Sequence, residues 1–116
     1  MSAETGVLIV YCTVPDDETA RMLSERLVNE RLCACVTCTG PVTSHYVYDG
    51  TYHEDEEIVL TIKTTRQGFD ALAERIEALH PYEVPEIVAV PAARVNAAYA
   101  AWVHENVRQE MRAPLV

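Results

Sequence analysis

The first third of the chain combines an unbroken apolar run with an amphipathic segment. The run at residues 7–11 (VLIVY) is rich in β-branched side chains and predicts a central strand buried on both faces. Apolar residues then recur at helical spacing as far as about Leu32, and Asp16 stands where an N-cap is expected. The pattern therefore predicts a strand followed by a helix.

A long hairpin follows. Residues 32–48 have strand character, interrupted at Gly40-Pro41 as a bulge or bend would be. Asp49-Gly50 is typical of a two-residue hairpin turn, and residues 51–64 form the returning arm. At about 3.3 Å per residue each arm exceeds about 30 Å, against an expected radius of gyration of about 13 Å. The outer half of this hairpin must therefore leave the core of its own chain.

The outer half of the hairpin is aromatic, with Tyr46, Tyr48 and Tyr52. An unpaired strand edge of this kind invites pairing with another chain. The alternative is a shorter hairpin with a loose tip. We favour pairing between copies, which predicts a homo-oligomer.

The second half repeats the strand and helix signals. Residues 66–79 carry a helical apolar stripe that ends at His80-Pro81, because the residue before proline avoids the helical region. Residues 86–90 predict a fourth strand. Asn96 is expected to cap a last helix, whose stripe includes Trp102 as a core or interface residue.

The order β-α-β-β-α-β plus one helix predicts an α+β, ferredoxin-like fold. We expect a single domain over residues 1–116, with a core at about 6–107 and a frayed tail at 108–116. With 49% hydrophobic residues, one core is feasible without a disulfide or a metal.

Charge and composition restrict the partners. The net charge is −9, which argues against nucleic acid or an anionic membrane as a ligand. The sequence shows neither a signal-peptide pattern nor an apolar run long enough to cross a membrane, so a cytoplasmic protein is expected. The cysteines should then be reduced thiols.

Several ordered segments together resemble the CutA family of divalent-cation-tolerance proteins. They span about residues 6–107, and it is their conjunction that is distinctive. They comprise Cys12-Thr13-x-Pro15-Asp16, Leu32-Cys33-Ala34-Cys35-Val36, Tyr46-x-Tyr48-x-Gly50, the run Glu57 to Thr64, His80-Pro81-Tyr82-Glu83-x-Pro85-Glu86, and finally Tyr99 and Trp102.

The resemblance implies a trimer in which long hairpins exchange edges between subunits, with an architecture similar to PII signalling proteins. It also implies a role in tolerance of copper and other divalent metals, a cytosolic location and no enzymatic activity. Motifs typical of nucleotide-binding, zinc-protease or serine-hydrolase sites are absent from the sequence.

Cys12 and His80 are the candidate metal ligands. Similar proteins assign copper to this cysteine together with two consecutive histidines before Pro-Tyr, but here the first of those positions is Leu79. We therefore expect weak copper binding, strengthening between about pH 6 and 8 as an unperturbed imidazole and thiol lose their protons. The alternative is a buried cysteine and a histidine that ends a helix.

A second candidate site is an inter-subunit cleft. The resemblance places Cys35, Glu57, Lys63, Tyr82 and Glu86 there. The alternative is a turn held by proline and hydrogen bonds. A cleft of this kind would suit a PII-like module that binds a small ligand or a partner, with metal tolerance an indirect effect.

Two further clusters have simpler explanations. Cys33, Cys35 and Cys38 could bind Cu(I), but buried free thiols are the favoured interpretation. The acidic segment 53–57, apart from Glu57, which abuts the apolar run, is expected to be a charged strand edge that opposes aggregation. The sequence as a whole predicts a trimeric, non-enzymatic protein that responds to divalent metal ions and binds copper or a similar cation.

Overall fold

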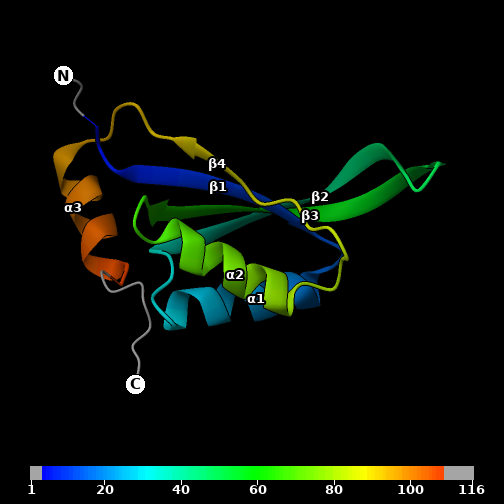
Figure 1. Cartoon of the computed structure of the whole chain (residues 1–116), viewed down its shortest axis with the longest axis horizontal. Coiled ribbons are helices and arrows are strands. Elements are labelled where there is room, and N and C mark those ends of the chain that lie inside the picture. The colour runs from blue at the N-terminus through cyan, green and yellow to red at the C-terminus, as the bar shows by residue number, and fades with distance from the viewer. Residues whose placement is uncertain (1–3, 109–116) are drawn as a thin grey trace.

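The protein is a four-stranded antiparallel sheet with helices α1 and α2 on one face (Figure 1). The computed structural model describes residues 4–108, so most of the expected tail, residues 109–116, lies outside the described part. The strand order is β2-β3-β1-β4, which is the split βαβ arrangement that the sequence predicts. The elements are β1 (Val7–Val14), α1 (Asp17–Asn29), β2 (Cys35–Tyr48), β3 (Thr51–Thr65), α2 (Phe69–Leu79), β4 (Val88–Pro91) and α3 (Ala97–Asn106).

Local chemistry explains where most of these elements begin and end. The Asp16 side chain accepts the backbone N–H of Thr19 at 2.8 Å, so the predicted N-cap of α1 is confirmed. That helix ends at Asn29, earlier than expected, and Arg31 then adopts a left-handed φ of 61°. Helix α2 ends at Leu79 as predicted, but it begins at Phe69 because residues 66–68 form a turn.

The expected cap of α3 is wrong in detail. Asn96 occupies the N-cap position, but its side chain makes no capping hydrogen bond. The helix is held by packing instead, because Val103 is fully buried beside Val7 and Ala34. Trp102 lies outside this cluster and is 42% exposed, so it is not a core residue of the single chain.

The β2–β3 hairpin extends well beyond the helices, as its length predicts (Figure 1). The chain measures 44 × 36 × 24 Å, and its radius of gyration is 15.0 Å. Asp49 and Gly50 both have positive φ, which is the requirement of a type I′ turn. The register shifts once, between Thr39 and Val42, so the Gly40-Pro41 interruption is a bulge.

The main core lies between the sheet and helices α1 and α2. Its fully buried members include Val10 and Cys12 of β1, Leu60 and Ile62 of β3, and Leu72 of α2. Alternate residues of the strands point to the other face, as the two-residue period requires. Helix α3 covers only one end of that second face.

The uncovered part of the second face is apolar and is called the open sheet face below. The expectation that residues 7–11 are buried on both faces is therefore wrong for the single chain. Tyr11 is 37% exposed, Val88 is 51% exposed and Val90 is 44% exposed. The open sheet face comprises Ile9, Tyr11, Val59, Thr61, Val88 and Val90, which are neighbours in the strand register.

No helix within residues 4–108 is both long enough and apolar enough to cross a membrane.

Gly68 provides a test of the packing where α2 begins. A Cβ at Gly68 would lie 2.7 Å from Val107 Cγ1 and 2.8 Å from Thr64 Oγ1, closer than real contacts allow. We expect Gly68→Ala to lower the free energy of unfolding by about 1–3 kcal/mol, because the added methyl group overpacks the site and because alanine is unfavourable at the N-cap of α2. Chemical denaturation measures the change. Gln67→Ala, at an exposed position of the same turn, is the control. A Gly68→Ala protein at least as stable as the parent would contradict the packing.

Candidate functional site

The segment that joins α2 to β4 forms a corner against the end of β1. His80 begins this corner as the C-cap of α2, with its backbone N–H bonded to the Ile76 carbonyl at 2.8 Å. Pro81 and Pro85 then restrict the backbone on either side of Tyr82. The corner brings polar side chains of residues 80–86 next to the base of the hairpin.

Both ring nitrogens of His80 are engaged within the chain. Nδ1 accepts the backbone N–H of Tyr82 at 3.1 Å, so Nε2 carries the proton and donates it to the Thr13 carbonyl at 2.8 Å. The imidazole is 8% exposed and lies 4.7 Å from the Tyr82 ring, centroid to centroid. His80 thus links β1, the end of α2 and the corner. A metal ion would have to displace one of its two hydrogen bonds.

Cys12 is fully buried near the end of β1. Burial raises the pKa of its thiol to about 12, and the negative charges of Glu86 and Glu57 act in the same direction. The thiol is therefore neutral at physiological pH and packs as a small apolar side chain. Metal binding requires the thiolate, so the position is unfavourable for a ligand.

Leu79 packs against the main core instead of offering a donor. Within residues 4–108, no three His, Cys, Asp or Glu side chains are grouped so that they could hold a metal ion. Cys12 and His80 are thus both near the end of β1, but the described residues do not complete a coordination sphere around them.

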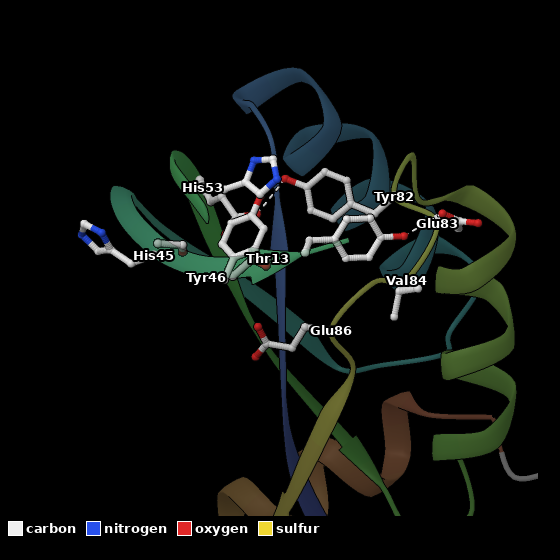
Figure 2. A pocket seen from close by; sticks show the side chains of 11 residues that line it. Thr13, His45, Tyr46, His53, Tyr82, Glu83, Val84 and Glu86 are labelled. Atoms are coloured by element: carbon white, nitrogen blue, oxygen red, sulfur yellow. Dashed lines mark hydrogen bonds between the residues drawn. The ribbon is translucent and has the colours of Figure 1, made fainter. Parts of the chain in front are cut away.

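A cavity of about 500 Å³ opens between the corner and the hairpin (Figure 2). It contains three of the predicted cleft residues, Glu57, Tyr82 and Glu86. Thr13 of β1 closes one side, and the corner and the hairpin supply the others. Its full lining is Thr13, Ser44, His45, Tyr46, Tyr48, His53, Glu57, Tyr82, Glu83, Val84 and Glu86.

Hydrogen bonds between tyrosines and carboxylates join the corner to the hairpin. The Tyr82 hydroxyl donates to Glu57 at 2.7 Å, and the Tyr48 hydroxyl donates to Glu83 at 2.7 Å. In the first bond the corner donates to the hairpin, and in the second the hairpin donates to the corner. Burial, followed by the bond to Glu57, raises the pKa of Tyr82, so this phenol remains a donor at physiological pH.

The other two predicted cleft residues lie apart from this cavity. Cys35 pairs with Lys63 in the β2–β3 register, six residues further along β3 than Glu57. The Cys35 thiol and the Tyr99 hydroxyl are 3.5 Å apart, and the Lys63 ammonium is 5.9 Å from the Tyr99 ring centroid. Among the ion pairs of residues 4–108, none joins Lys63 to Glu57.

The three clustered cysteines do not share one environment. Cys33 is buried in the main core, Cys35 is half-buried, and Cys38 is exposed with its thiol 3.6 Å from the Ser24 hydroxyl. The expectation of buried thiols is therefore confirmed for Cys33 and wrong for Cys38, because Cys38 lies on the edge strand β2.

Sequence reasoning missed eight of the eleven residues that line the cavity, among them Tyr46, Tyr48, His53 and Glu83. The tyrosines were interpreted only as contacts to another copy, and His53 as part of a charged edge. Counting back from the two-residue turn would have placed Tyr46 opposite His53, and the two rings are indeed stacked 5.1 Å apart. No sequence pattern places Glu83 at the cavity, because its position depends on the path of the backbone through the corner.

These features define a small α+β protein with an elongated hairpin and a polar cavity at its base. The family model described as CutA1 divalent ion tolerance protein matches residues 8–106. The chain belongs to this family. It is 49% identical over 98 residues to the divalent-cation tolerance protein CutA of Thermus thermophilus, covering 84% of this chain and 95% of that protein.

Solved structures of the family have the same fold. The divalent cation tolerance protein Cut A1 of Thermus thermophilus superposes with a TM-score of 0.85 at 47% identity, covering 88% of this chain and 99% of that chain. CutA of Archaeoglobus fulgidus, which carries the description periplasmic, superposes with a TM-score of 0.84 at 28% identity over 88% of this chain and 99% of its own.

Thiol labelling tests the electrostatics of the site. At pH 8 we expect a thiol reagent to modify Cys38 rapidly and to leave Cys12 and Cys33 unmodified, because burial raises the pKa of both to about 12. Mass spectrometry of timed digests identifies the labelled residue. Cys38→Ser should remove the fast phase. Labelling of native Cys12 as fast as Cys38 would show that the end of β1 is open.

Proposed function

We propose that the protein acts in the tolerance of divalent metal ions as a homotrimer. Membership of the divalent-cation tolerance family supports the role in metal tolerance. The observation that supports self-assembly is the open sheet face, with Tyr11, Val88 and Val90 left exposed on the single chain. Apolar side chains that lie together on one surface mark an interaction site.

The assembly we propose buries the open sheet face against neighbouring copies and uses the projecting hairpin to hold them. Val47, Tyr48 and Tyr52 near its tip are 68%, 45% and 61% exposed, respectively. Trp102 packs against Tyr99, with the ring centroids 5.6 Å apart and the rings tilted by 37°, beside the same face of the sheet. Trp102 is then an interface residue, in line with its apolar character.

We place the protein in the cytoplasm and assign it binding without catalysis. The four cysteines are free thiols in the structure, which suits a reducing compartment. A Cys12–His80 nucleophile and base would need a thiolate and an available imidazole nitrogen. Burial keeps the Cys12 thiol neutral, and both nitrogens of His80 are hydrogen-bonded.

For the metal, we propose weak copper binding with Cys12 and His80 as the first donors. The thiol must lose a proton whose pKa is about 12, and the imidazole must give up a hydrogen bond to Thr13 or Tyr82. Both requirements lower the affinity. They also make it dependent on pH, because the metal competes with the thiol proton.

The oligomeric state is tested by charging the open sheet face. We expect the parent protein to be a trimer by light scattering at micromolar concentration, and Val88→Asp to give smaller species, because a buried unpaired carboxylate opposes association. Val84→Asp is the matched control, since Val84 is 70% exposed on the corner and not on the sheet. A monomeric parent protein, or a trimer that survives Val88→Asp, would contradict the assembly.

Copper binding should continue to strengthen above pH 8. The sequence predicted a rise between about pH 6 and 8 from unperturbed groups, but the raised pKa of Cys12 extends the rise towards pH 12. One proton released per ion corresponds to an affinity gain of up to about tenfold per pH unit.

Calorimetric titration at several pH values measures this dependence, with Cys12→Ala and His80→Ala as the tests and Cys38→Ala as the matched control. A plateau above pH 8 would show that Cys12 is not a ligand. Undiminished binding in the Cys12→Ala, His80→Ala double variant would place the copper elsewhere.

A further inference from the structure

The cavity at the base of the hairpin is lined by acidic side chains and by neither lysine nor arginine. The acidic side chains are Glu57, Glu83 and Glu86. Glu57 is the most informative of the three because it is only 6% exposed. Its carboxylate accepts a hydrogen bond from the neutral Tyr82 hydroxyl, and the ion pairs among residues 4–108 do not include it. A buried carboxylate without a counter-ion favours a bound cation.

The geometry argues for an organic cation over a metal ion at this position. A metal needs several ligand atoms within about 2.0–2.6 Å of one point, and the described residues form no such group of three. The carboxylates come instead from β3 and from separate positions of the corner, around a space of about 500 Å³. That volume lies in the range of sites for small organic molecules.

Aromatic rings supply most of the rest of the lining. Tyr46, Tyr48 and Tyr82 border the cavity, and each donates its hydroxyl proton to a carboxylate, namely Asp55, Glu83 and Glu57, respectively. Figure 2 shows Tyr46, His53 and Tyr82 gathered on one side of the cavity, with Glu86 apart from them. The hydrogen bonds fix the rings, and the face of a fixed ring attracts a cation.

We propose that this cavity binds a small organic ammonium ion, held by Glu57 and Glu86 and by the faces of the tyrosine rings. The cavity lies within one chain, and the argument uses neither Cys12 nor His80. The site therefore shares no ligand residue with the copper site proposed above, but the two are coupled electrostatically, because the charges of Glu57 and Glu86 act on the Cys12 thiol. The acidic net charge of −9 would also favour the approach of a cation.

The test compares choline with its uncharged isostere 3,3-dimethyl-1-butanol by calorimetric titration of the whole protein. The two probes have almost the same shape and differ in charge. We expect choline to bind at least about tenfold more tightly than the alcohol. Equal binding of the two, or no binding of choline up to about 10 mM, would overturn the proposal.

Variants locate the site. Glu86→Gln should weaken choline binding about tenfold and leave the fold intact, because Glu86 is exposed. Glu77→Gln, which changes another exposed carboxylate, on α2 outside the cavity, should bind choline as the parent does. Tyr48→Phe should keep most of the affinity, and Tyr48→Leu should lose it, because the ring is the contact. Unchanged affinity in Glu86→Gln would overturn the proposal.

Light scattering and copper titration on the same samples separate this site from the proposed function. A protein that binds choline but is monomeric, or that binds choline but not copper, would support the ammonium site and contradict the proposed function. Choline binding by Val88→Asp alone, and not by the parent assembly, would overturn the inference, since a neighbouring subunit would then fill the cavity.

Discussion

The sheet is covered by helices on one face only, and the rest of the structure follows from that constraint. Helices α1 and α2 bury Val10, Cys12 and Leu60, but the alternate residues of the same strands point away from them. Helix α3 is too short to cover more than one end, so Tyr11, Val88 and Val90 remain exposed. Burial of such area is worth about 25 cal/mol per Å², which favours association of several copies.

The hairpin connects the open sheet face to the cavity. Its outer part projects beyond the core, and its base is held to the corner by the Tyr82–Glu57 and Tyr48–Glu83 hydrogen bonds. His80 fixes the other side of the corner to the Thr13 carbonyl. In the assembly that we propose, a change in how the hairpin packs against another copy would therefore move the residues that line the cavity.

Features set by short-range chemistry could be predicted from the sequence. Asp49-Gly50 fixed the hairpin turn, and His80-Pro81 marked the end of α2, because each depends on backbone geometry within a few residues. Features that depend on distant packing were missed. Tyr11 looked buried because its neighbours in sequence are apolar, and Glu83 joined the cavity only through the path of the corner.

Oxidative footprinting of the native protein tests most directly whether the open sheet face is covered in solution. In the single chain Tyr11 is 37% exposed and Trp102 is 42% exposed, so both would react readily if the face were free. The assembly predicts that both are protected in the parent protein and become reactive in Val88→Asp. Equal and rapid oxidation of Tyr11 in the two proteins would contradict it, because the sheet would then be open to water in both.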